Sequence, residues 1–219
     1  MVREIPEHQK KWQAMTDGRA RIGEELKEIE VEGLVHKGVG QTHEQGPRIG
    51  TRVSIRVATP WDGEGLRAMF SRASSETIYR RFHIPYPDVP ERTLALMLDV
   101  DHHDKVSLVA VAEGGIVGHA MYARGGDGSE AEMAIIVEDG CQSKGVGKLL
   151  LRKLAERALS RGVETFVGTV LIENRRMLGL IGAVFTESRR VFADGVYHFR
   201  APLRTLEPAD PIRILRRVA

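Results

Sequence analysis

A short glycine-rich segment between a strand pattern and a helix pattern constrains the fold of this chain most. The segment reads Gln142-Ser143-Lys144-Gly145-Val146-Gly147-Lys148. The largely apolar run over 131–137 predicts a strand, and the apolar spacing over 145–161 predicts a helix. Glycines at a helix start let backbone N–H groups surround an anion, and the helix dipole adds positive potential. We therefore expect a ligand that carries phosphate.

Two common phosphate-binding motifs do not fit this segment. A P-loop needs a glycine five residues before Gly147 and a Ser or Thr after Lys148, but the chain has Gln142 and Leu149 there. The dinucleotide pattern G-x-G-x-x-G fails because Leu150 occupies the third glycine position. What remains is Q-x-x-G-x-G between a strand and a helix.

The remaining patterns predict a mixed sheet with helices packed on it. Thr59-Pro60-Trp61-Asp62 has the residues of a helix start with a capping box. Gly114-Gly115 and Asp194-Gly195 predict tight hairpin turns. The predicted strands cover 53–57, 106–111, 116–122, 131–137, 165–171, 188–193 and 196–201. Because strands and helices do not alternate regularly, a uniform βαβ fold is not expected.

The loop and the order of these elements resemble the GNAT superfamily of acyl-CoA-dependent N-acyltransferases. The resemblance implies an α/β fold with a largely antiparallel central sheet of about seven strands flanked by helices, over residues 51–205. It implies that acetyl-CoA is the cosubstrate and that Gln142 to Lys148 bind its pyrophosphate. It also implies that Asn174 lies near the pantetheine arm, and that the backbone of Ile135, Ile136 and Val137 faces the thioester carbonyl.

Shorter cues are similar to the catalytic domain of bacterial protein lysine acetyltransferases. They are the runs 75–82, 131–134 and 174–178. This resemblance implies a primary amine acceptor, with a protein lysine favoured, and makes Glu132 the general base with Glu130 in reserve. The chain departs from many superfamily members at Ile181, where they carry a tyrosine that protonates the leaving thiolate. A small-molecule amine acetyltransferase and a non-catalytic CoA-sensing module remain as alternatives.

The segments outside this domain carry different patterns. Residues 1–50 are expected to form a helical arm followed by a glycine-containing linker, and the arm offers a route to a homodimer. Residues 206–219 form a basic C-terminal tail. No apolar run approaches the length of a membrane span, and the N-terminus lacks the apolar core of a secretory signal.

Charge and cysteine content limit the partners and the compartment. The 32 basic and 30 acidic residues give a net charge of +2, so no nucleic-acid partner is expected. A single cysteine, Cys141, cannot form an internal disulfide, which favours a cytoplasmic protein. The run Asp101-His102-His103-Asp104 is interpreted as the polar residues of a short loop rather than as a metal site, so no metal is expected. Tyr79, Arg80 and Arg81 either line the acceptor side or pack their helix.

Overall fold

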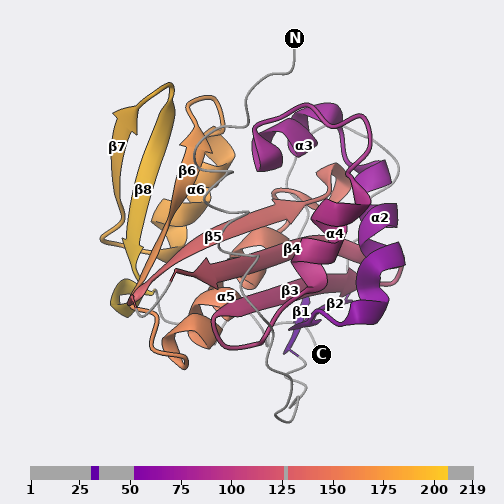
Figure 1. The fold of residues 1–219 in the computed structure, drawn as a ribbon, viewed down its shortest axis with the longest axis horizontal. Helices are drawn as coiled ribbons and strands as arrows, with labels where there is room; N and C mark the ends of the chain where they lie inside the picture. The colour runs from indigo at the N-terminus through magenta and orange to yellow at the C-terminus, as the bar shows by residue number, and fades with distance from the viewer. Residues whose placement is uncertain (1–30, 35–51, 126–127, 207–219) are drawn as a thin grey trace, which may run out of the picture.

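A computed structural model describes residues 31–34, 52–125 and 128–206 of the chain. Within them an eight-stranded mixed sheet runs in the order β1-β2-β3-β4-β5-β6-β8-β7 (Figure 1). The strands are β1 Val31–Leu34, β2 Arg52–Val57, β3 Lys105–Ala112, β4 Gly115–Arg124, β5 Glu130–Val137, β6 Thr165–Leu171, β7 Arg189–Ala193 and β8 Val196–Pro202. Only β5 and β6 pair in parallel, so the largely antiparallel sheet predicted from the sequence is confirmed.

The prediction of about seven strands omitted β1. Val31–Leu34 lies inside the segment assigned to the helical arm, yet it pairs antiparallel with β2 and extends the sheet by one strand. Its sequence, VEGL, is too short to show a two-residue period, and the pairing partner is about twenty residues away. The rest of the arm, its suggested dimer contact and the tail beyond residue 206 lie outside the described residues.

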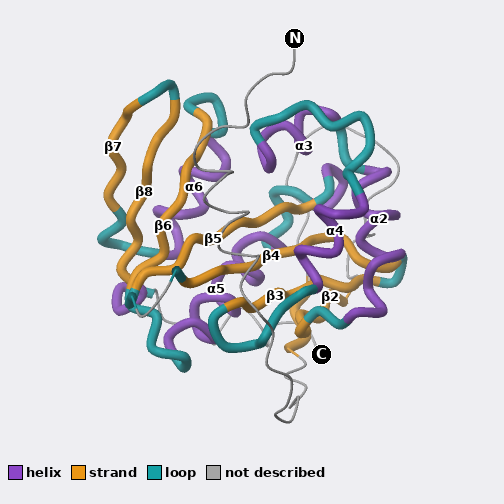
Figure 2. Tube along the Cα trace, in the orientation of Figure 1, coloured by secondary structure: helices purple, strands orange, loops and turns teal. Residues whose placement is uncertain are grey.

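Helices cover both faces of the sheet (Figure 2). One face packs against α2 Gly63–Arg72, α3 Ser75–Phe82 and α4 Glu91–Leu98, and the other packs against α5 Val146–Leu159 and α6 Arg175–Val184. The short 3-10 turns are η1 Pro60–Asp62, η2 Asp139–Cys141 and η3 Leu203–Thr205. Both faces of β3 are apolar: Leu108 packs in the α5 core and Val109 in the α2 core. The central strands are therefore buried on both sides and hold the site rigidly.

The predicted helix start at Thr59 is present as a capping box. Thr59 donates its backbone N–H to Asp62 Oδ2 over 2.7 Å, and Arg56 donates to both oxygens of the same carboxylate. Burial opposes ionisation of Asp62, but the hydrogen bonds from Arg56 and Thr59 outweigh it and lower the pKa of this carboxyl below 3.8. One carboxylate thus ties β2 to the start of α2.

Replacing Asp62 is expected to destabilise the fold in a pH-dependent way. Asp62→Asn should lower the free energy of unfolding by about 2 kcal/mol at pH 7, because the half-buried Arg56 guanidinium loses its ion pair with the buried carboxylate. Because the folded-state pKa is lowered, the wild-type stabilisation is present above the unfolded pKa and is lost as pH falls through the folded value. Urea denaturation at pH 7, 5 and 3.5 should show the difference between the two proteins shrinking with acid. A difference that stays constant over this range would contradict the role of the ionised carboxylate.

Candidate active site

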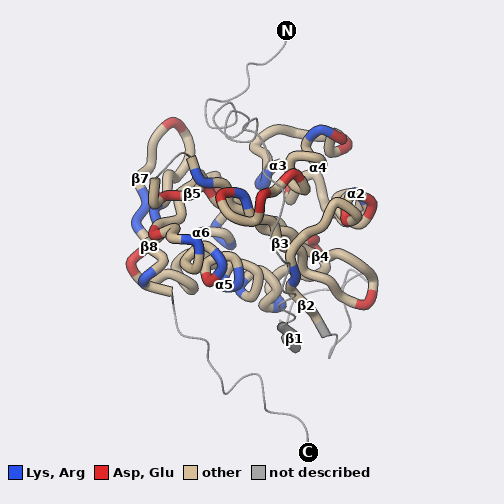
Figure 3. Tube along the Cα trace, turned by 60° about the horizontal axis from the view of Figure 1, so that its bottom comes forward, with Lys and Arg blue, Asp and Glu red and all other residues tan. Residues whose placement is uncertain are grey.

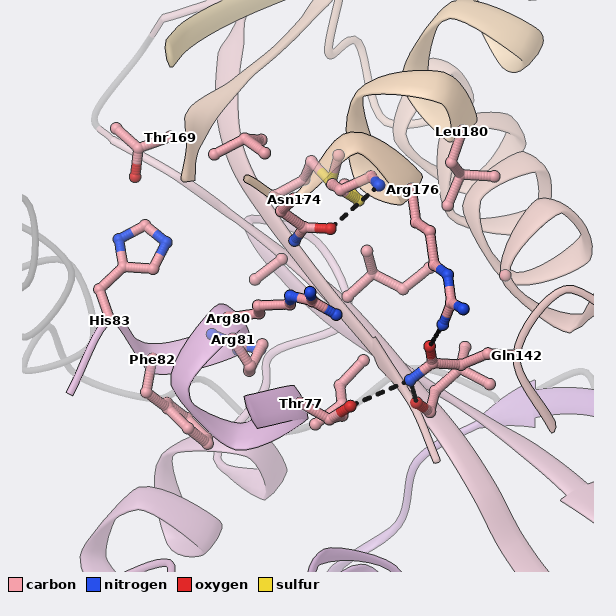
Figure 4. Close-up of a pocket in the computed structure, with 18 of the residues that line it drawn as sticks. Thr77, Arg80, Arg81, Phe82, His83, Gln142, Thr169, Asn174, Arg176 and Leu180 are labelled. Carbon is pink, nitrogen blue, oxygen red and sulfur yellow. Dashed lines mark hydrogen bonds between the residues drawn. The ribbon is translucent and has the colours of Figure 1, made fainter. Parts of the chain in front are cut away.

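The parallel pairing of β5 and β6 ends inside the molecule. Its register stops at Glu132, opposite Val167, and the two strands separate from there. A cavity of about 530 Å³ opens beyond this point. Its walls come from α3, α4, β5, β6, the glycine-rich loop and α6, and Figure 4 shows many of the lining side chains. The fold therefore places a hollow where two neighbouring strands diverge.

The glycine-rich loop forms one end of this cavity. Gly145 is the N-cap of α5 with φ of +93°, a backbone conformation that glycine adopts without strain, and α5 begins at Val146. The loop therefore turns sharply into the helix, and the N-terminal N–H groups of α5 lie beside the cavity. A Cβ added at Gly145 would meet nothing within 4 Å, so the space in front of the loop can accept a ligand.

The structure brings most of the sequence-predicted residues to the cavity. Those in its lining are Glu132, Ile135, Ile136, Val137, Gln142, Ser143, Gly145, Gly147, Lys148 and Asn174. Val146 instead points into the core and is 1% exposed, so only its backbone can serve a ligand. Lys144, which also belongs to the loop, is half-buried and is not part of the cavity lining.

Glu130 and Glu132 lie in different environments. Glu130 lies at the start of β5, outside the cavity lining, and forms an ion pair with both guanidinium nitrogens of Arg200 on β8. Glu132 lies in the cavity lining where β5 and β6 separate. The geometry therefore favours Glu132 over Glu130 as the carboxylate that can meet a substrate.

A buried arginine on α3 accompanies Glu132. Arg81 also lines the cavity, with its guanidinium 4.9 Å from the centre of the Phe82 ring. Burial lowers the pKa of Arg81 to about 10, and the negative charge of Glu132 acts in the opposite direction. The arginine remains a cation at neutral pH, and its charge favours the ionised form of Glu132.

Asn174 closes the cavity from α6. Its side-chain oxygen accepts the Met177 N–H over 3.1 Å, which caps α6. Figure 4 shows the amide nitrogen of Asn174 on the cavity side. Asn174 thus starts the short helix after β6, and its amide nitrogen can also donate to a ligand.

Several other polar or titratable residues have structural roles. Cys141 is buried and donates to Glu138, and burial with this contact raises the pKa of its thiol to about 12, so it is no nucleophile. His119 is fully buried against Ser107, and burial followed by the Arg81 charge lowers its pKa to about 3. Asp101 accepts three backbone N–H groups of its own loop. Among the described residues no cluster of metal-ligating side chains occurs.

Sequence reasoning missed part of the lining. The sequence leaves open whether Tyr79, Arg80 and Arg81 line the acceptor side or pack their helix. In the structure Arg80 and Arg81 line the cavity, whereas Tyr79 does not. Thr77, His83, Tyr86, Thr169 and Arg176 also line it and were not predicted. They come from α3, the loop after it, β6 and α6, and no local pattern marks them because only the tertiary packing brings these segments together.

The cavity, the loop and the strand separation agree with the comparison to known proteins. Residues 69–182 match the family model described as Acetyltransferase (GNAT) family. The chain belongs to this family. Its fold is the one that the family resemblance of the loop and of the element order implied, and the match assigns the GNAT domain as an acetyl-CoA-dependent N-acetyltransferase domain with acetyl-CoA as cosubstrate.

Individual bacterial acetyltransferases are similar to this chain. Acetyltransferase Pat of Mycolicibacterium smegmatis is 33% identical over 147 residues, which are 63% of this chain and 43% of the relative, so the chain spans less than half of that protein. The GNAT domain of S. lividans PAT superposes with a TM-score of 0.68 at 27% identity, covering 79% of this chain and 96% of that one. The Salmonella typhimurium acetyltransferase yncA, solved with its cofactor acetyl-CoA, shares the fold at 20% identity, with a TM-score of 0.56 over 73% of this chain and 97% of that one.

None of the helices in the described part of the chain is both long enough and apolar enough to cross a bilayer.

Proposed function

We propose that the protein transfers an acetyl group from acetyl-CoA to the side-chain amine of a lysine in a protein substrate, with Glu132 as the general base. The observation that carries the proposal is the position of Glu132, in the cavity lining where β5 and β6 separate. The runs 75–82, 131–134 and 174–178, which are similar to the catalytic domain of bacterial protein lysine acetyltransferases, support a protein acceptor. The cytoplasm, where thiols such as Cys141 stay reduced, is the compartment that this proposal implies.

The walls near Glu132 suit a lysine side chain. Tyr86, Leu96, Met97 and Phe199 line the same cavity and are mainly apolar. A lysine carries four methylene groups before its amine, and such a stem is favourably buried against apolar walls. The carboxylate of Glu132 would then lie near the end of the stem, where the amine needs a proton acceptor.

The reaction needs a neutral amine. A free lysine amine has a pKa near 10.4 and is mostly protonated at neutral pH. Glu132, directly or through a water molecule, takes one proton from the ammonium group, and the neutral nitrogen then attacks the thioester carbonyl carbon. The second N–H proton passes to solvent as the amide forms. The carbonyl oxygen gains negative charge in this step, and backbone N–H groups of β5 within 135–137 are the proposed donors to it. The C–N bond forms, the C–S bond breaks, and CoA leaves as a thiolate.

The leaving thiolate takes its proton from solvent in this proposal. Ile181, which replaces the tyrosine of many family members, is 3% exposed and packs in the core beside α5. It offers no hydroxyl. A thiol pKa near 8.5 makes the thiolate a good leaving group that needs little acid assistance.

The proposal is tested by thiol release with acetyl-CoA against a panel of proteins, lysine peptides and small amines, followed by mass spectrometry of the products. The expected result is acetyl-CoA-dependent thiol release with a mass increase of one acetyl group on lysine residues. Thiol release only with small amines would show that the acceptor is a small-molecule amine rather than a protein lysine. Tight acetyl-CoA binding without thiol release from any acceptor would favour a CoA-sensing module instead.

A further inference from the structure

Arg176 contacts the phosphate loop from the opposite helix. It is the second residue of α6, and its Nη1 donates to Oε1 of Gln142 over 2.7 Å (Figure 4). Arg176 lines the main cavity and also a smaller polar cleft between α3 and α6. The guanidinium therefore stands at the boundary between the two, within reach of the loop.

Gln142 is itself held in place by two other elements. Its Nε2 donates to the Val137 carbonyl over 3.0 Å and to the Thr77 hydroxyl over 3.1 Å. The Thr77 hydroxyl in turn donates to Asp139 Oδ1 over 2.8 Å, so β5, α3 and the loop share one network. Both ends of the Gln142 amide are thus engaged by protein groups. Its oxygen forms a fixed point to which Arg176 binds.

Two of the three carboxylates near Arg176 are already bound to other groups, and its guanidinium has donors left for an anion. Glu76, Asp139 and Glu173 line the smaller cleft. Glu76 is paired with Arg80, and Asp139 accepts from Ser74 and Thr77. A guanidinium has five N–H donors in a planar fork that matches phosphate oxygens, and the contact to Gln142 needs one of them. Figure 3 shows further basic residues along α5 and α6.

We propose that Arg176 is a ligand of the pyrophosphate of acetyl-CoA. Gln142 is then a positioning residue that holds the Arg176 guanidinium over the loop. The backbone N–H groups at the start of α5 bind the pyrophosphate from one side, and Arg176 binds it from the α6 side. This inference rests on the assignment of acetyl-CoA to the cavity and adds a side chain to its phosphate site.

The neighbouring Arg175 provides a matched control. It lies in the same first turn of α6 and carries the same charge, but it lines only the smaller cleft. Calorimetric titration with acetyl-CoA should show a roughly 10- to 100-fold weaker Kd for Arg176→Gln, as expected for the loss of hydrogen bonds to a charged group. Arg175→Gln should stay within about threefold of wild type. Equal losses in the two variants would show a general charge effect and overturn the proposal.

A truncated ligand identifies the phosphate. Acetyl-dephospho-CoA keeps the pyrophosphate and lacks the 3′-phosphate, so Arg176→Gln should lose the same factor with it as with acetyl-CoA. If the loss disappears with the truncated ligand, Arg176 binds the 3′-phosphate and the proposal is wrong. If wild-type protein does not bind acetyl-CoA at all, the proposed function fails, which is a separate result.

The role of Gln142 is tested in a second background. In a Gln142→Leu protein, replacing Arg176 should cost clearly less affinity for acetyl-CoA than in wild type, because the guanidinium has already lost the contact that positions it. Equal factors in both backgrounds would show that Gln142 does not act through Arg176.

Discussion

Glu132→Gln is expected to lower kcat by roughly 10²- to 10⁴-fold and to leave the acetyl-CoA Kd within about twofold of wild type. Glutamine keeps the size of the side chain but cannot accept the proton of the attacking amine. The phosphate loop, which supplies the contacts to the CoA moiety in this proposal, is ten or more residues away along the chain. Turnover and affinity should therefore separate, with kcat from thiol release on the best acceptor and Kd from calorimetry.

Glu130→Gln is the matched control for this experiment. It makes the same chemical change two residues earlier on β5, at a side chain that pairs with Arg200 outside the cavity lining. Because exposed ion pairs contribute little, this variant should keep its kcat within about threefold of wild type. If Glu130→Gln loses turnover and Glu132→Gln does not, Glu130 rather than Glu132 is the general base. Full activity in both would remove a β5 carboxylate from the mechanism.

The parts of the site that the sequence predicts are local. Q-x-x-G-x-G between a strand and a helix predicts a phosphate loop because the helix N–H groups and the glycines lie within seven residues. The Thr59 capping box is similarly short-range and is present in the structure. Such features can be predicted because neighbouring residues along the chain supply both partners of the interaction.

The parts that the sequence does not predict are long-range. Arg72 reaches the buried Glu138 across 66 positions, and Arg176 reaches Gln142 across 34. Arg81 interacts electrostatically with Glu132 only because α3 packs on β5. Arginines are common in this chain, and composition alone does not show which of them belong to the site. Tertiary packing selects the few that belong to the site.

Gly145→Ala is expected to weaken acetyl-CoA binding at least tenfold. Gly145 has φ of +93°, and an L side chain at such an angle costs about 1–2 kcal/mol. The loop can relieve this strain only by turning the peptide units that begin α5, and this rotation moves the N–H groups proposed to bind the pyrophosphate. Because hydrogen bonds to anions depend strongly on direction, the affinity falls even though no side-chain contact is removed. Calorimetric titration measures the effect.

Gly162→Ala separates strain from binding, since Gly162 follows the other end of the same helix with φ of +78°. A Cβ at either glycine meets nothing within 4 Å, so neither variant creates a clash. The two variants should therefore lose similar free energies of unfolding, about 1–2 kcal/mol by urea denaturation. Only Gly145→Ala should lose affinity for acetyl-CoA. If both variants bind acetyl-CoA as wild type does, the backbone turn at Gly145 is not what orients the phosphate site. If both lose affinity equally, general destabilisation rather than loop geometry is the cause.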